Sequence, residues 1–200
     1  MAPQDLAAKI ACCILSLLCY SSFTWSILRF FDRGSGMAVR MKAISITGVA
    51  SMLGHLTGIS LETGFDEQRL AISVVLFVLS LGCFWWALRT TWQSKLPIAF
   101  SATEPTHLVR QGPFRLVRHP IYLSYMLAWI AGAVAIPSWW PWVVPLIMGL
   151  QYLSAIRQEE KMFLSGSLSS DYRAYIASVG MMFPNPIKMM GSGGYSATGL

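Results

Sequence analysis

PIYLSYMLAWIAGAVAIPSWWPWVVPLIMGLQYLSAI, residues 120–156, holds two apolar runs with only Pro137 and Ser138 between them. The first run, residues 121–136, has 16 residues. At a rise of about 1.5 Å per residue, such a helix reaches about 24 Å, short of a hydrocarbon core of about 30 Å. Helices joined by so short a link pack as antiparallel neighbours. We therefore predict a tight helical hairpin, with its tryptophan-rich tip near one membrane–water boundary, where indole rings gather.

Three longer apolar stretches precede this hairpin, at residues 6–27, 43–61 and 70–88. Hydrophobic residues make up 54% of the chain and charged residues 12%. A soluble domain carries about 25% charged residues, so most of this surface does not face water. We predict an all-α integral membrane protein with about five transmembrane helices, the last two of which form the hairpin.

The charged residues sort between alternate loops. Arginine and lysine gather after the first, third and fifth predicted helices, whereas residues 62–69 are mainly acidic and the hairpin tip carries no charge. Basic loops stay in the cytosol, so the pattern predicts an N-terminus outside and a cytosolic C-terminus. The same loops account for the net charge of +6. We therefore expect the lipid bilayer, and not nucleic acid, as the partner.

Metal chemistry finds no support in the sequence. The 4 cysteines lie in apolar stretches, and none forms a metal-ligand spacing with a histidine. Neither an HExxH motif nor a phosphate-binding loop occurs. We therefore predict no metal site.

A polar segment precedes the hairpin on its predicted cytosolic side. Pro120 can occupy the first position of the fourth helix, where its missing N–H costs nothing, and His119 is then the cap residue. The free N–H groups at this helix end attract an anion. Arg118 can hold a carboxylate through two hydrogen bonds. The segment is therefore a candidate anion site.

Two carboxylates follow the predicted fifth helix. Glu159 and Glu160 come directly after it, close to Arg157. An antiparallel hairpin brings its two outer ends together, so these residues should face Arg118 and His119. One wall of the resulting cytosolic pocket offers cations and donors, and the other offers carboxylates. Such a pocket suits a ligand that carries both charge signs and hydroxyl groups.

Residues 112–122, GPFRLVRHPIY, closely resemble the G-P-[YF]-x-x-[VIT]-R-H-P-x-Y signature of the isoprenylcysteine carboxyl methyltransferase family. Membrane phospholipid methyltransferases carry a similar signature. The resemblance covers about residues 96–186, with Ser169 in the place of a usual glycine. Shorter elements of the family's pattern occur in the same order: HLV at 107–109, RQEE at 157–160, Tyr172, Tyr175 and the Phe183-Pro184 pair.

This resemblance implies methyl transfer from S-adenosyl-L-methionine at the cytosolic membrane face. The cofactor pocket would be closed by the loop before the hairpin, by the hairpin itself and by the C-terminal segment. Arg157 and Glu160 are implied as catalytic residues, which place the acceptor or handle its proton. Cofactor-binding roles are implied for His107, Leu108, Val109, Gly112, Arg118, His119, Pro120, Tyr122, Glu159 and Glu160.

The chain then divides into three helices in residues 1–90, a catalytic region in residues 91–188 and a disordered tail in residues 189–200. The implied acceptor is lipidic or prenylated, and the favoured candidate is an isoprenylcysteine-type carboxylate. Four alternatives stay open: a phospholipid amine, a small thiol, a sterol-reductase-like enzyme that uses NADPH, and a non-catalytic membrane module. The sequence indicates no oligomeric state.

Overall fold

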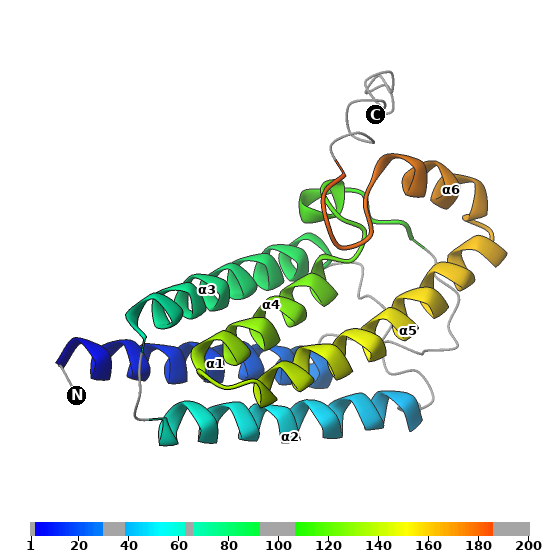
Figure 1. Ribbon diagram of the computed structural model, residues 1–200. Helices are drawn as coiled ribbons and strands as arrows, with labels where there is room; N and C mark the ends of the chain where they lie inside the picture. The colour runs from blue at the N-terminus through cyan, green and yellow to red at the C-terminus, as the bar shows by residue number, and fades with distance from the viewer. Residues whose placement is uncertain (1–2, 30–38, 63–65, 93–106, 186–200) are drawn as a thin grey trace.

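The computed structural model describes residues 3–29, 39–62, 66–92 and 107–185. Within these residues the regular structure is helical, as predicted, apart from one isolated parallel bridge (Figure 1). The loop residues 93–106 and the predicted tail at 189–200 lie outside the described residues. The elements are α1 (Pro3–Arg29), α2 (Val39–Leu61), α3 (Glu67–Thr90), η1 (Gly112–Arg115), α4 (Pro120–Ala135), η2 (Trp140–Trp142), α5 (Val143–Ser165) and α6 (Ser169–Ser178).

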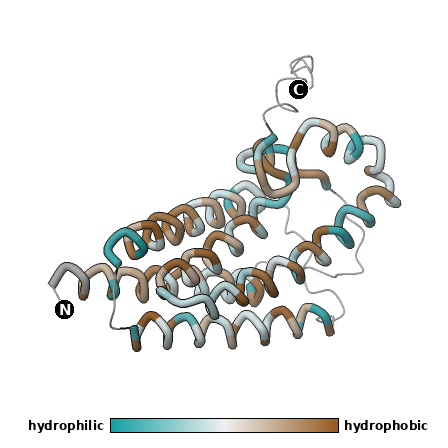
Figure 2. The backbone as a smooth tube through the Cα atoms, in the orientation of Figure 1, coloured by the Kyte–Doolittle hydropathy of each residue, from teal (hydrophilic) through white to brown (hydrophobic). Residues whose placement is uncertain are grey.

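Three helices are long and apolar enough to cross a membrane: Leu6–Arg29, Val39–Leu61 and Glu67–Thr90. They agree with the first three predicted spans, and the chain is an integral membrane protein by this criterion. Brown, apolar segments run along these helices in Figure 2. α4 is apolar but has only 16 residues. The crossing of the membrane by α4 and α5 therefore stays a prediction.

Two boundaries in the predicted hairpin were wrong. The turn is longer than Pro137 and Ser138, because η2 lies within it and α5 begins only at Val143. At its other end, α5 continues beyond Ile156 to Ser165, so that Arg157, Glu159 and Glu160 lie inside the helix and not after it. The residues after Ile156 contain neither glycine nor proline until Gly166, and most of them favour a helix.

Small polar side chains join the first, third and fourth helices. Ser73 and Ser80 of α3 donate to the backbone oxygens of α4 at 2.9 and 2.7 Å. On the same face, Cys12 and Cys19 of α1 contact these two serines at 3.7 and 3.8 Å. Side chains this small let the helices approach closely, and their hydrogen bonds are satisfied inside the bundle. Cys12 and Cys19 therefore act as small packing residues.

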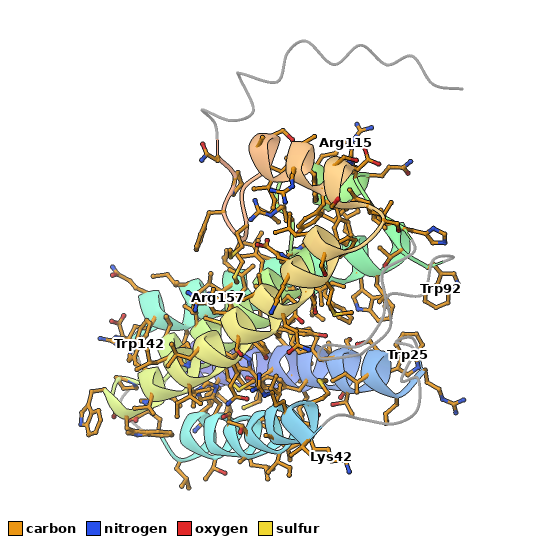
Figure 3. The ribbon with its side chains drawn as sticks, turned by 90° about the vertical axis from the view of Figure 1, so that its right-hand side faces the viewer. Trp25, Lys42, Trp92, Arg115, Trp142 and Arg157 are labelled. Atoms are coloured by element: carbon orange, nitrogen blue, oxygen red, sulfur yellow. The ribbon has the colours of Figure 1, made fainter. Side chains whose placement is uncertain are left out.

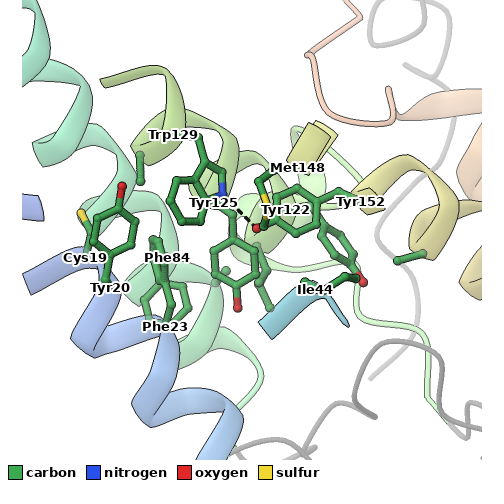
Figure 4. Close-up of a cluster of buried hydrophobic side chains, with 14 of the residues drawn as sticks. Cys19, Tyr20, Phe23, Ile44, Phe84, Tyr122, Tyr125, Trp129, Met148 and Tyr152 are labelled. Carbon is green, nitrogen blue, oxygen red and sulfur yellow. Dashed lines mark hydrogen bonds between the residues drawn. The ribbon is translucent and has the colours of Figure 1, made fainter. Parts of the chain in front are cut away.

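The buried core of the described residues falls into three clusters, and the one in the C-terminal segment consists of Tyr172, Tyr175 and Val179. A cluster rich in aromatic rings extends from Cys19 and Tyr20 towards Ile156, and close contacts join its rings (Figure 4). A smaller aliphatic cluster, which contains Ile59 and Ile136, fills the end of the bundle near the hairpin turn. The aromatic cluster draws its residues chiefly from α1, α3, α4 and α5, and it extends to the end where the polar residues of the sequence motif meet.

The C-terminal segment returns to the start of α4 (Figure 1). The backbone N–H of Arg118 donates to Gly180 O at 2.8 Å, and that of His119 donates to Met181 O at 3.0 Å. Val117 forms the isolated bridge with Gly180. One strap of backbone, residues 179–182, therefore lies beside the segment that carries the motif.

Candidate functional site

The site is organised around one ion pair between α4 and α5. Arg118 approaches Glu160 Oε1 with Nε at 3.0 Å and with Nη2 at 2.9 Å. The two side chains are only 6% and 15% exposed. The third guanidinium nitrogen, Nη1, donates to Val179 O at 2.6 Å. The anion at this helix end is thus the protein's own carboxylate, whereas the sequence had suggested a seat for a ligand.

His119 lies between the two glutamates. Its Nε2 is 3.0 Å from Glu160 Oε1, and its Nδ1 is 3.8 Å from Glu159 Oε2. Pro120 begins α4 and His119 is the cap residue, as predicted, although the His119 side chain makes no capping bond to the helix. The imidazole instead couples the start of α4 to α5.

Glu159 has a second partner on α4. The Tyr122 hydroxyl donates to Glu159 Oε1 at 2.5 Å. Tyr122 is buried among aromatic rings, which include Tyr125 and Tyr152. The two glutamates are therefore held by different groups, although they are neighbours in the sequence. Glu160 is held by the Arg118 guanidinium and the His119 imidazole, and Glu159 chiefly by a phenol.

These surroundings separate the pKa values of the two carboxyl groups. Burial raises the pKa of Glu159 and outweighs the lowering effects of His119 and Tyr122, and the charge of Glu160 makes the smallest contribution, a further rise. Burial also acts to raise the pKa of Glu160, but the His119 hydrogen bond and the Arg118 charge outweigh it, so its pKa is lowered. One carboxyl can therefore exchange a proton more readily, while the other stays ionised.

A cavity of about 340 Å³ opens beside this network. Arg118, His119, Tyr122 and Glu159 line its polar end. Its deeper part is apolar and lies between α1, α2, α4 and α5. The cavity thus joins a zwitterionic mouth to a hydrophobic interior.

Most of the site residues predicted from the sequence surround this cavity. The lining includes His107, Leu108, Val109, Arg118, His119, Pro120, Tyr122 and Glu159. Glu160 lies behind the wall and holds Arg118 and His119 in position. Arg157 is exposed on α5 and is not part of the lining (Figure 3). The structure therefore places Glu159 at the cavity, and it does not place Arg157 there.

Gly112 is also outside the lining. Its φ is +56°, a backbone conformation that glycine adopts without strain. A Cβ atom at this position would collide with the Thr90 hydroxyl and would lie 3.2 Å from the Trp86 indole nitrogen. Gly112 therefore turns the chain closely against the end of α3, which positions the segment of His107–Val109 beside the cavity.

Several lining residues were not singled out from the sequence. Phe163 of α5 stacks on Tyr172 of α6 with ring centroids 4.6 Å apart, and both line the cavity. Tyr175 lines it too, and its hydroxyl donates to Phe114 O at 2.5 Å. The tyrosines were visible as part of the motif pattern, but Phe163 carried no such signal. The lining residues of α1 and α2 likewise look like ordinary apolar helix residues.

Chemically, the cavity can hold a molecule with a charged, hydroxylated end and an apolar or aromatic remainder. Among the described residues, no group of three or more His, Cys, Asp or Glu side chains could hold a metal ion. The polar end thus offers carboxylate acceptors, cationic donors and phenol rings.

Comparison with known proteins identifies a family with such chemistry. The family model described as phospholipid methyltransferase matches residues 68–170, about half of the chain. The match begins in α3, continues through α4 and α5, and ends at the start of α6. No curated protein matches the chain.

Proposed function

Because the chain belongs to the phospholipid methyltransferase family, we propose that it transfers a methyl group from S-adenosyl-L-methionine to a lipidic acceptor. The observation that carries this proposal is a cavity that joins the Arg118–His119–Glu159 mouth to an apolar interior. A methyltransferase for lipids needs both parts. The donor is polar and zwitterionic, while the acceptor brings an aliphatic chain.

The residues at the mouth fit the donor. The carboxylate of Glu159 can accept hydrogen bonds from an amino group or from ribose hydroxyls. The rings of Phe114, Tyr122 and Tyr172 offer faces for a sulfonium cation. Arg118 and His119 would hold the methionine end, and Glu160 keeps both side chains in position. The wall opposite α4 would be formed by His107, Leu108 and Val109. The turn at Gly112 would hold this segment in place.

When bound, S-adenosyl-L-methionine would supply an activated methyl group, and the S–C bond would break as the new bond to the acceptor forms. The protein's task is to align the acceptor atom with this bond and to exclude water, which is a proximity effect. The buried, aromatic lining of the cavity supports both. S-adenosylhomocysteine leaves as the second product.

The acceptor that the motif favours is an isoprenylcysteine-type carboxylate, because residues 112–122 follow that family's signature closely. A carboxylate needs no base. On this reading Arg157, which is proposed to place the acceptor, acts from the outer rim of the site.

A phospholipid amine is the second candidate, and one observation favours it. Glu159 faces the cavity with a raised pKa, so it can accept the proton that an ammonium group must lose before or during methyl transfer. The nitrogen would gain the methyl group, and Glu159 would take the proton. In this case Glu159, and not Glu160, is the base.

We also propose that the mouth faces the cytosol and that α4 and α5 complete five membrane crossings, with residues 91–188 as the catalytic region. Tryptophans at both ends of the bundle support this, with Trp25 and Trp92 at one end and Trp142 at the other (Figure 3). The basic loops support the orientation.

A C-terminal fusion to a fluorescent protein should be fluorescent, and a fusion to alkaline phosphatase should be inactive. The opposite pair of results would reverse the orientation.

Calorimetric titration of the purified protein tests the donor. We expect S-adenosylhomocysteine to bind and NADPH not to bind. Arg118→Ala should abolish binding while Arg157→Ala retains it, with the melting temperature of each variant as a control for folding. Binding of NADPH alone would favour the reductase alternative, and binding of neither would overturn both enzyme readings.

The acceptor requires a separate assay. Labelled methyl transfer should be measured with a prenylcysteine, an aminophospholipid and a small thiol. Transfer to one of the two lipids supports the proposal, whereas transfer to the thiol alone would contradict a lipidic acceptor. Donor binding without transfer to any of the three would leave a binding module as the better description.

A further inference from the structure

The cavity ends inside the bundle at a floor of two stacked aromatic rings. Along their helices, the lining residues farthest from the polar mouth are Tyr20 of α1, Met52 of α2, Trp129 of α4 and Met148 of α5. Trp129 lies about two and a half turns into α4, which places it roughly 14 Å below Pro120 at the rise of an α-helix. The Tyr20 and Trp129 rings stack there with centroids 4.8 Å apart (Figure 4).

Polar contacts hold both rings of this floor. The Trp129 indole N–H donates to the Tyr152 hydroxyl at 2.9 Å. The Tyr20 hydroxyl lies 3.4 Å from His55 Nδ1. His55 is fully buried, and its ring fits into the space that Gly132 leaves on α4. A pair of rings that is fixed by polar partners from α2 and α5 resists displacement better than free apolar side chains would.

The bundle beyond the floor is closed. The aliphatic cluster with Ile59, Leu70 and Ile136 fills the end near the hairpin turn, and each of these residues is at most 2% exposed. A flexible chain that enters from the mouth therefore meets a fixed end and not a passage.

We infer that the Tyr20–Trp129 pair is a ruler, which limits the length of the aliphatic chain on the acceptor that the cavity admits. The inference rests on the proposed function for the identity of that chain. Its evidence is the continuity of the apolar space with the polar mouth at Glu159, the depth of that space, and the braced rings at its end. A chain that fits keeps its head group at the mouth, whereas a longer chain pushes the head group away from it.

Two glycines of α2 provide a matched test. A Cβ atom on Gly48 would lie 3.9 Å from both Trp129 and Met148, so a larger side chain at this position extends into the cavity. A Cβ atom on Gly54 would meet nothing within 4 Å. Gly48→Leu should therefore shorten the usable cavity, and Gly54→Leu should leave it unchanged. Tyr20→Ala should open the floor.

The measurement is chain-length-dependent binding, which does not depend on turnover. The probes are n-alkyl phosphoethanolamines and S-alkyl cysteines of increasing length, and the readout is the rise in melting temperature of the protein in nanodiscs. For the wild type, affinity should fall about tenfold beyond a limiting length, as expected when a packed site is overfilled. Gly48→Leu should move this limit to chains about four carbons shorter, the size of the added side chain. Tyr20→Ala should move it to longer chains.

The outcomes separate this inference from the proposed function. The same limit in all variants, no limit in the wild type, or no binding of any probe would overturn the ruler. Shifted limits without methyl transfer would support the ruler and contradict the proposed activity. Methyl transfer with the same length limit in all variants would support the proposed activity and contradict the ruler.

Discussion

The Arg118 guanidinium directs two of its nitrogens at a single oxygen of Glu160, at 3.0 and 2.9 Å, and uses the third to hold the backbone of Val179. One buried side chain thereby joins the start of α4, the end of α5 and the C-terminal strap. Leaving one member of a buried ion pair without its partner costs about 3–5 kcal/mol. The pair is therefore expected to stabilise the mouth of the cavity as well as to shape it.

The first prediction concerns Glu160 and pH. The folded-state pKa of Glu160 is lowered, so its contribution to stability is present above the unfolded pKa and is lost as the pH falls through the folded pKa. Glu160→Gln should lower the free energy of unfolding at neutral pH by about 3 kcal/mol, because it leaves the buried Arg118 guanidinium without its anionic partner. Melting temperatures at neutral and acidic pH should show the difference between wild type and variant shrinking towards low pH.

An exposed ion pair serves as the control for this prediction. Asp171 lies 3.5 Å from Arg110, and the two side chains are 63% and 45% exposed. Asp171→Asn should cost less than about 1 kcal/mol at neutral pH. Equal losses for Glu160→Gln and Asp171→Asn would show that burial of the Arg118–Glu160 pair has no energetic consequence.

The second prediction concerns Glu159 as a base. If the acceptor is an amine, methyl transfer should increase as the pH rises through the raised pKa of Glu159, because only the ionised carboxylate accepts a proton. Glu159→Gln should remove this dependence and slow transfer about 100-fold. Tyr122→Phe removes a hydrogen bond that lowers the pKa of Glu159, so its profile should shift to higher pH. A flat profile with an active carboxylate acceptor would exclude this role.

The sequence predicted that Arg118 and His119 would lie opposite the Glu159–Glu160 pair. A hairpin must bring its outer ends together, and these motif residues lie at those ends. It also predicted the start of α4, where Pro120 and His119 take the expected positions. Such features depend on local backbone chemistry and on connectivity, both of which are visible in one chain.

Other features depended on tertiary contacts and were not predictable in this way. The sequence did not indicate which glutamate would face the cavity, because the choice depends on the rotation of α5 and on its continuation to Ser165. From the sequence, the anion that binds Arg118 was expected to belong to a ligand. In the structure it is the carboxylate of Glu160. The aromatic floor was also missed, since Tyr20 and Trp129 are far apart in the chain and meet only when α1 packs on α4.

The third prediction separates the two arginines that the sequence associated with the site. Arg118 is buried and lines the cavity, while Arg157 is exposed and lies outside its lining. We expect Arg157→Ala to leave the dissociation constant of S-adenosylhomocysteine within about threefold, since surface changes have small effects. An effect of Arg157→Ala confined to the KM of the acceptor would agree with its proposed placing role. Loss of donor binding in this variant would contradict the geometry of the site.

The last prediction concerns Gly132, which makes room for His55 behind the aromatic floor. A Cβ atom at this position would overlap the His55 ring, which is enclosed and cannot move aside freely. Gly132→Ala should therefore destabilise the protein by about 1–3 kcal/mol through overpacking. Gly82→Ala is the matched control, because a Cβ atom there meets nothing within 4 Å. It should be neutral or slightly stabilising, since alanine favours a helix more than glycine does.

A double variant identifies the cause of the Gly132→Ala effect. If the collision with His55 is responsible, His55→Ala removes it, and Gly132→Ala should then cost much less in that background than in the wild type. The measurement is the free energy of unfolding of each variant, followed by circular dichroism in one detergent. We expect the losses caused by the two substitutions to be strongly coupled. If the two losses of unfolding free energy simply add, His55 is not the neighbour that requires a glycine at position 132. The close fit of His55 against α4, which holds it beside the Tyr20 hydroxyl, would then lack support.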